Sequence, residues 1–178
     1  MNALKKQAGM TLTELVTALS VLAVLVALSA PSYSQFISKR NVAGAADLVA
    51  TFFQNAKMES VKHSQYVSVS YKKDGTSWCL GAKTGSACDC LQEPGQCEIG
   101  LLSSESHPNF DGLLAVFDEG TISYDPVRGI LTDPEASANV QIQHNQEDFR
   151  VNISVNAIGN IRKCSPSGHE LVGYAICI

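Results

Sequence analysis

The chain has 178 residues, a formal charge of −4 at neutral pH and six cysteines. This length is enough for one globular domain beside an N-terminal targeting or membrane segment. Because affinity for phosphate comes from clustered Lys and Arg, an acidic chain is a poor general binder of nucleic acid, and any such role needs a local basic patch.

An apolar run, Met10–Ala30, dominates the N-terminal part of the chain. About 21 residues at about 1.5 Å per residue span about 31 Å, the thickness of the apolar core of a bilayer. A secretory signal peptide is one explanation, since Lys5 and Lys6 precede the run and small residues end it. Such a core is normally shorter and uncharged, whereas this run contains Glu14. We therefore favour a short leader that is cut after Gly9 and an apolar helix that stays in the mature protein.

The stretch 5–15, KKQAG followed by MTLTEL, resembles the prepilin-peptidase site of type IV pilins and type II secretion pseudopilins. Pro31 at the end of the run also matches that family, while Met10 stands where the family has Phe. The resemblance implies that an inner-membrane peptidase cuts after Gly9, that the new amine of Met10 is methylated, and that Glu14 is the conserved acid. It also implies a single-pass anchor in the inner membrane and later assembly with other pilins or pseudopilins.

Glu14 has a physical role to play in such an assembly. Cleavage after Gly9 would leave the ammonium of Met10 four residues before this carboxylate. In a bundle of helices, the carboxylate of one chain can meet the ammonium of its neighbour, and a matched buried pair can set the register. We expect Glu14 to select the docking position; the alternative is an acid exposed to lipid headgroups.

All six cysteines follow the apolar run, which suits an oxidising compartment. The charge rule for topology is undecided, because Lys5 and Lys6 on one flank are balanced by Lys39 and Arg40 on the other. The cysteines therefore place the leader in the cytoplasm and the C-terminal part in the periplasm or outside. Loss of the two leader lysines takes the formal charge from −4 to −6.

Residues 31–62 are predicted to continue the first helix as an amphipathic half that packs under a small sheet. Pro31 and Gly44 would loosen or bend it. Apolar residues recur at helical spacing. They are Val42, Ala45, Val49, Phe52, Ala56 and, with a shift, Val61.

The remaining sequence predicts short strands separated by turn signals, which is typical of a mainly antiparallel sheet or small sandwich. The expected strands are 66–71, 77–82, 113–117, 121–125, 129–132, 140–144, 149–156, 160–165 and 171–178. Residues 85–108 are rich in Gly, Ser and Cys and show little periodicity, so we expect a long loop that cysteines hold in place.

The cysteines favour disulfides over zinc. Their spacings do not form the close pairs that zinc sites use, and no His is near them. Six cysteines allow 15 pairings, and the sequence does not choose among them. We expect Cys164–Cys177 to tie a final hairpin, with the other four paired among themselves. Those four are Cys79, Cys88, Cys90 and Cys97.

No motif indicates catalysis, a cofactor or a metal. The four histidines lie in separate segments without a nucleophile motif, and there is no phosphate-binding loop. A calcium site is conceivable where acids cluster around turns, although EF-hand spacing is absent. Those acids are Asp111, Asp118, Glu119 and Asp125.

A hairpin expected near the C-terminus, with Gly159, Arg162 and Lys163 close to a disulfide, resembles the end of the GspH/FimT branch of pilin-like proteins. That branch contains minor pilins of type IV pili and pseudopilins of type II secretion. Some minor pilins bind DNA there through a G-R-x-R motif. This chain has Gly159, Asn160 and Arg162 at the matching positions, with Lys163 next. Because Asn160 replaces an Arg, a charge-assisted phosphate contact is lost, and strand alternation would point Lys163 away from Arg162.

The sequence thus predicts an α+β, pilin-like chain. Its parts are a prepilin leader over 1–9, a helix over 10–62 that spans the membrane at 10–30, and a periplasmic β-rich domain over 63–178. We expect a minor pilin or pseudopilin that is not an enzyme, with a prepilin peptidase and other pilins as partners. The alternatives are a DNA receptor at a pilus tip, with a basic patch of Arg128, Arg150, Arg162 and Lys163, and a monomeric membrane-anchored β-domain.

Overall fold

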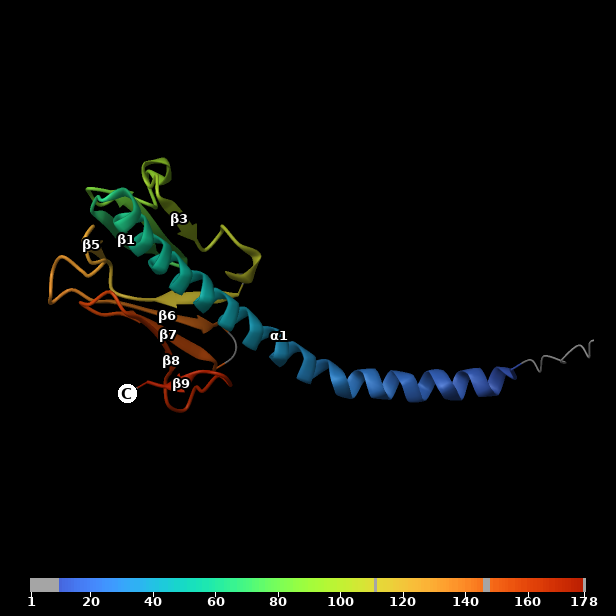
Figure 1. The fold of residues 1–178 in the computed structure, drawn as a ribbon. Helices are drawn as coiled ribbons and strands as arrows, with labels where there is room; N and C mark the ends of the chain where they lie inside the picture. The colour runs from blue at the N-terminus through green and yellow to red at the C-terminus, as the bar shows by residue number, and fades with distance from the viewer. Residues whose placement is uncertain (1–9, 111, 146–147, 178) are drawn as a thin grey trace, which may run out of the picture. The chain divides into compact units, whose positions relative to one another are not determined.

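The computed structural model describes residues 10–110, 112–145 and 148–177. The chain divides into two compact units between Ile37 and Ser38. One helix, α1 (Leu12–His63), contributes its first part to the first unit and its second part to the other (Figure 1).

The second half of α1 is amphipathic and packs on the β-strands. Its fully buried side chains recur at steps of three and four residues, as one face of a helix requires. They are Val42, Ala45, Ala46, Val49, Phe53 and Ala56. The predicted stripe is wrong at two positions, because Phe53 rather than Phe52 lies in the core and Val61 is 46% exposed. The helix ends where Ser64 takes a positive φ of 53° and Gln65 N–H donates to Ser60 O.

The first sheet has four antiparallel strands in the order β3-β2-β1-β5. Their bounds are β1 (Val67–Asp74), β2 (Ser77–Thr84), β3 (Gly100–Ser103) and β5 (Gly120–Tyr124). A tight turn with Gly75 at φ 59° joins β1 to β2, as the sequence predicts. Residues such as Val69, Leu80 and Ile122 point from this sheet into the core.

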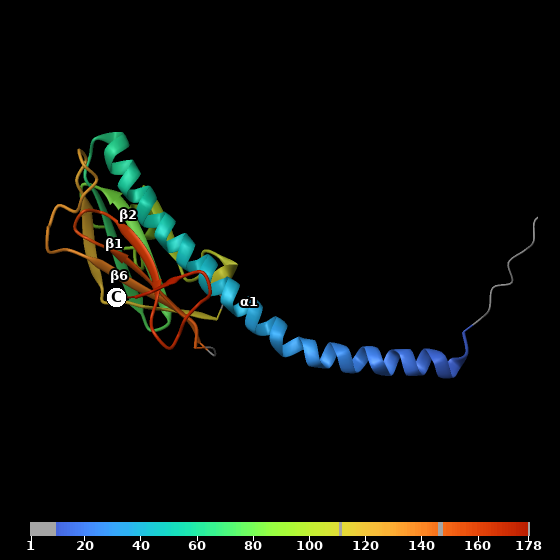
Figure 2. The same cartoon turned by 60° about the horizontal axis from the view of Figure 1, so that its bottom comes forward.

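The second sheet has five strands in the order β4-β6-β7-β8-β9. Their bounds are β4 (Leu113–Val116), β6 (Ala138–His144), β7 (Arg150–Val155), β8 (Ile161–Ser165) and β9 (Ala175–Ile176). Alternate residues of β6 and β7 are buried, which is typical of an antiparallel sheet with one face in water. Figures 1 and 2 show the second half of α1 lying across the sheets, and both sheets contribute to one core.

One loop prediction and two strand predictions are wrong. The loop expected over 85–108 contains β3 as well as a 3-10 turn, η1 (Pro94–Gln96), and a second turn, η2 (Pro108–Phe110), begins at its end. Residues 129–132 form only an isolated bridge between Tyr124 and Leu131. The final hairpin is absent, because β9 is two residues long and pairs parallel to β8. The chain makes this parallel pairing by looping back through residues 166–174 before it reaches β9.

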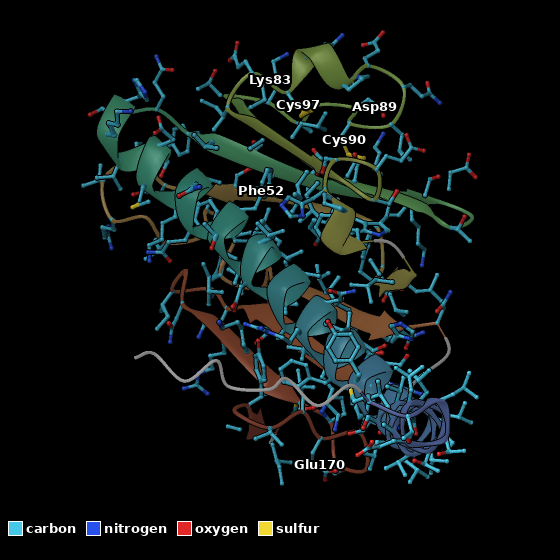
Figure 3. All side chains as sticks on the ribbon, turned by 90° about the vertical axis from the view of Figure 1, so that its right-hand side faces the viewer. Phe52, Lys83, Asp89, Cys90, Cys97 and Glu170 are labelled. Atoms are coloured by element: carbon cyan, nitrogen blue, oxygen red, sulfur yellow. A yellow bond between two sulfur atoms is a disulfide. The ribbon has the colours of Figure 1, made fainter. Side chains whose placement is uncertain are left out.

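All six cysteines form disulfides, in the pairs Cys79–Cys90, Cys88–Cys97 and Cys164–Cys177. The first two bridges cross, so that the loop after β2 folds back over one face of the first sheet (Figure 3). Small residues lie on the strands beneath the bridges, where Ser70 pairs with Gly81, and Lys72 on the same face forms an ion pair with Asp89 of the loop. The four buried half-cystines form a separate small cluster with Leu91, and they cover this sheet face in place of a second apolar layer.

Candidate functional site

The first candidate surface is the part of α1 in the first unit. Thr11 caps the helix, since its Oγ1 accepts the N–H of Glu14 at 3.3 Å. Glu14 is therefore the third residue of the helix, where a carboxylate is stabilised by the positive end of the helix dipole. The capping role was not part of the sequence interpretation, although the pattern Thr-x-x-Glu could have indicated it.

The hydroxyl groups within the apolar run are satisfied by the helix itself. Thr17 donates to Glu14 O at 3.0 Å, Ser20 donates to Thr17 O at 2.8 Å, and Ser29 donates to Leu25 O at 2.9 Å. Such bonds remove the need for water at these groups. This stretch of helix can therefore lie in lipid or against other helices without unsatisfied hydroxyls.

Large apolar side chains are exposed all around this part of the helix. Among them are Leu12, Leu15, Val16, Leu19, Val21, Leu22, Val24, Leu25, Val26 and Leu28, each at least half exposed. The length and composition of α1 would allow it to cross a membrane, and none of its most apolar stretch is buried inside the protein. The apolar surface extends to Tyr33, Phe36 and Ile37. Within one chain this surface is uncovered, so it requires lipid or other helices.

Not all residues of the predicted processing site can be placed. Gly9 lies outside the described residues, whereas Met10 and Glu14 are both exposed at the start of α1. Pro31 lies inside α1, where it lacks an amide hydrogen and so cannot donate to the carbonyl of Ala27.

The predicted basic hairpin exists between β7 and β8, but it does not bring Arg162 and Lys163 together. Arg162 pairs with Ser154 and is exposed. Lys163 points to the other face and forms an ion pair with Asp47 of α1. This hydrogen bond is the main reason that the pKa of Lys163 lies above its usual value. Lys163 is thus part of the helix–sheet contact.

Gly159, the glycine of the same stretch, has a packing role. Its φ is 69°, and a Cβ at this position would lie 2.3 Å from Gly129 O. Lys57 of α1 donates from Nζ to Gly159 O at 3.0 Å. The glycine therefore allows close approach of two turns beneath the helix, which explains its presence without a ligand.

The proposed wider basic patch also loses a charge to an internal contact. Arg150 forms an ion pair with Asp148 at 3.2 Å, and Asp148 lies 2.7 Å from His169 Nδ1. Arg128 is exposed in a turn that is capped by Asp125 Oδ1, which accepts the Arg128 N–H at 2.9 Å. These pairings reduce the net positive charge available to a phosphate backbone.

Two of the acids considered for calcium accept backbone N–H groups. Besides its bond to Arg128, Asp125 accepts the N–H of Val127, and Glu119 accepts the N–H of Lys73. Asp111 lies outside the described residues, and Asp118 lines a shallow hollow with Asn139, Gln141 and Asn152. Within residues 10–110, 112–145 and 148–177, no three His, Cys, Asp or Glu side chains are grouped to hold a metal ion.

Comparison with known proteins adds two family matches. The model for type II transport protein GspH matches residues 45–159, and the prokaryotic N-terminal methylation motif matches residues 4–30. No curated protein matches the chain.

Two solved structures are similar to the chain. One crystal form of the type IV minor pilin FimU from Pseudomonas aeruginosa has a TM-score of 0.50 and 20% identity, over 76% of this chain and 99% of that chain. A second crystal form of FimU has a TM-score of 0.47 and 17% identity, over 71% and 98%. The first likeness shows a shared fold: a long helix on β-sheets, here with disulfides.

Proposed function

The chain belongs to the GspH family of type II transport proteins, and we propose that its N-terminal helix anchors it in the inner membrane and later carries it into a filament. Its family makes it a minor pilin or pseudopilin, which is a structural subunit. One observation supports the proposed role of the helix most strongly. The N-terminal methylation motif coincides with a helix whose apolar side chains are exposed on all sides.

The size of this apolar surface sets the energy available for anchoring and assembly. Covering one Leu or Val side chain fully is worth about 1.5–3 kcal/mol. Ten such residues between Leu12 and Leu28 are at least half exposed. Transfer of this surface from lipid to a bundle of similar helices changes the hydrophobic term little, so packing and polar contacts must decide the final position.

Glu14 is the polar group that supplies such a contact. A prepilin peptidase cuts after Gly9, and the methylated amine of Met10 becomes the chain terminus. The carboxylate of Glu14 then pairs with the terminal ammonium of a neighbouring pilin-type chain. The β-domain lies in the periplasm, where its three disulfides form. The chain itself has no catalytic role in this process.

The mature N-terminus tests this proposal directly. The full chain is expressed with a prepilin peptidase, recovered from membranes and sequenced from its N-terminus. We expect N-methylated Met10 as the first residue. A start beyond Ala30 would instead show a secreted domain without a helix, and the proposal would then be wrong.

Incorporation into filaments tests the role of Glu14. We expect Glu14→Gln to be cleaved and membrane-bound but to enter filaments at least about 100-fold less than the unchanged chain, because the Met10 ammonium of the neighbouring chain would be buried without its partner, which costs about 3–5 kcal/mol. The matched control is Glu105→Gln, which removes an exposed carboxylate of the β-domain. Equal incorporation of Glu14→Gln and the control would exclude the pairing role.

A further inference from the structure

Three residues at the start of the second helix half contact the C-terminal side of the fold. They are Lys39, Ala43 and Asp47, which are four residues apart and so lie on one face of α1. Lys39 Nζ lies 4.6 Å from the centre of the Phe149 ring. Ala43 O accepts the hydroxyl of Tyr174 at 3.4 Å, and Asp47 pairs with Lys163. This face is next to the buried stripe that begins at Val42.

Tyr174 belongs to a closed segment that we call the C-terminal strap, residues 166–177. The disulfide Cys164–Cys177 joins its end to β8, and the N–H of Cys177 donates to Ser165 O at 3.0 Å. Parallel pairing of β9 with β8 adds to this closure. The strap carries Glu170, which is labelled in Figure 3.

The side chain of Ser165 forms hydrogen bonds to the backbone of the strap. Its hydroxyl is fully buried, lies 2.7 Å from Arg150 O and 2.9 Å from His169 O, and accepts the N–H of Leu171 at 3.0 Å. Leu171 is 4% exposed and belongs to the main core. The strap is therefore anchored in the core at Leu171 and hydrogen-bonded to Ser165, whereas Val172 is 93% exposed.

Lys163 links the strap to the helix. Its ammonium pairs with Asp47 and lies 5.7 Å from the centre of the Tyr174 ring. The hydroxyl of Tyr174 donates to Ala43 O, and burial and the charge of Asp47 raise its pKa. One contact from β8 and one from the strap thus meet the same two turns of α1.

We propose that the C-terminal strap, closed by Cys164–Cys177, positions the helix segment Lys39–Asp47 and so fixes the point at which α1 ceases to be supported by the β-domain. Each contact is weak by itself, because exposed ion pairs are worth little. Together the contacts of Lys39, Ala43 and Asp47 hold the helix next to residues 39–41, whose side chains are not buried. Loss of the strap would free the turn of helix before Val42, whereas Val42, Ala45 and Ala46 are fully buried and stay in the core.

This positioning matters for assembly, a consequence that rests on the proposed function. A filament subunit must present a fixed length of free helix to its neighbours. Release of residues 38–41, which precede the buried Val42, adds four residues to the unsupported part, or about 6 Å at about 1.5 Å per residue. A subunit with a variable free length would dock its N-terminus in several registers, and its incorporation would fall.

Hydrogen exchange of the full chain in detergent micelles tests the strap. The double variant Cys164→Ala/Cys177→Ala opens it, and Cys88→Ala/Cys97→Ala is the control, because it removes one bridge at the first sheet. We expect the amides of 42–47 to exchange about tenfold faster in the first variant, while those of 53–60 change less than twofold. The control should leave 42–47 unchanged. Unchanged exchange of 42–47 in the strap variant would overturn the proposal.

A charge exchange separates this contact from a general loss of stability. Lys163→Glu places two carboxylates together, so the amides of 42–47 should exchange faster. The double variant Asp47→Lys/Lys163→Glu restores opposite charges and should restore slow exchange. Failure of this restoration would show that the pair does not position the helix.

Filament incorporation of the strap variant tests the consequence for assembly. We expect a chain that is cleaved at Met10 but enters filaments at less than half the normal level. Fast exchange with normal incorporation would overturn the positioning role in assembly. It would leave the proposed function intact, since that is judged by the N-terminus and Glu14.

Discussion

Gly81 is the residue on which the crossed disulfides of the first sheet depend. A Cβ at this position would lie 2.3 Å from Cys97 Sγ, 2.8 Å from Cys88 Sγ and 2.9 Å from Cys90 Cβ. All three distances are below van der Waals contact, and the atoms belong to bridged residues that cannot rotate away. Gly81→Ala must therefore displace the disulfide loop or prevent a bridge from forming.

The expected loss of stability in Gly81→Ala depends on whether both bridges still form. If both bridges form, the overpacked methyl group should cost about 1–3 kcal/mol. The disulfide Cys88–Cys97 closes a loop with a sequence separation of 9. If it fails to form, the free energy of unfolding falls by about 2.6 kcal/mol in the chain-entropy model. Either way the free energy of unfolding should fall by at least about 1 kcal/mol.

The matched control lies in the same loop. Gly95 does not have a positive φ, and a Cβ built there meets no atom within 4 Å. Gly95→Ala should leave stability unchanged or raise it slightly, since alanine reduces the freedom of the unfolded chain.

Urea unfolding of the full chain in detergent micelles, with titration of free thiols, measures both effects. We expect Gly81→Ala to unfold at lower urea and to show free thiols in a fraction of molecules. If its stability is within 0.5 kcal/mol of the unchanged chain, by the usual ~0.5 kcal/mol scatter of surface substitutions, and all thiols are oxidised, the packing argument is wrong.

Three further changes can be measured in the same way. Tyr124→Phe should raise the free energy of unfolding by about 1 kcal/mol, because the Tyr124 hydroxyl is buried and has no hydrogen-bond partner among the described residues; a loss of stability would reveal a partner. Ser165→Ala should lower it by about 1–3 kcal/mol, since the N–H of Leu171 loses its buried acceptor; an unchanged midpoint would contradict this role. A hydrogen bond from Lys72 lowers the pKa of Asp89, so this pair stabilises the fold above the ordinary carboxyl pKa and is lost as the pH falls through the lowered value. Asp89→Asn should therefore flatten the acid side of the stability–pH curve, and an unaltered curve would exclude the contribution.

Local patterns were sufficient to predict much of this fold. The predominantly apolar run Met10–Ala30 identifies a helix that is unfavourable in water, whatever the rest of the chain does. Turn signals between short stretches of strand-forming residues located β1, β6 and β7. Pairing of Cys164 with Cys177 is also as expected, although the final hairpin that this bridge was expected to tie is absent.

Features that depend on contacts between distant segments were missed or misassigned. β3 has no alternation of its own and is a strand because β2 pairs with it. β9 pairs parallel to β8 because the strap returns through Leu171, which the core buries. A stripe of apolar residues could not decide between Phe52 and Phe53, since the sheets beneath determine which ring is covered.

The sequence by itself determined that this chain has an apolar N-terminal rod with an acid near its start and a disulfide-bonded β-domain, because composition and spacing carry that information locally. Only the tertiary structure decided that Lys163 forms an ion pair with α1 instead of contacting a ligand. The fold brings it to Asp47 across 116 positions of sequence, and no local pattern records a partner at that distance.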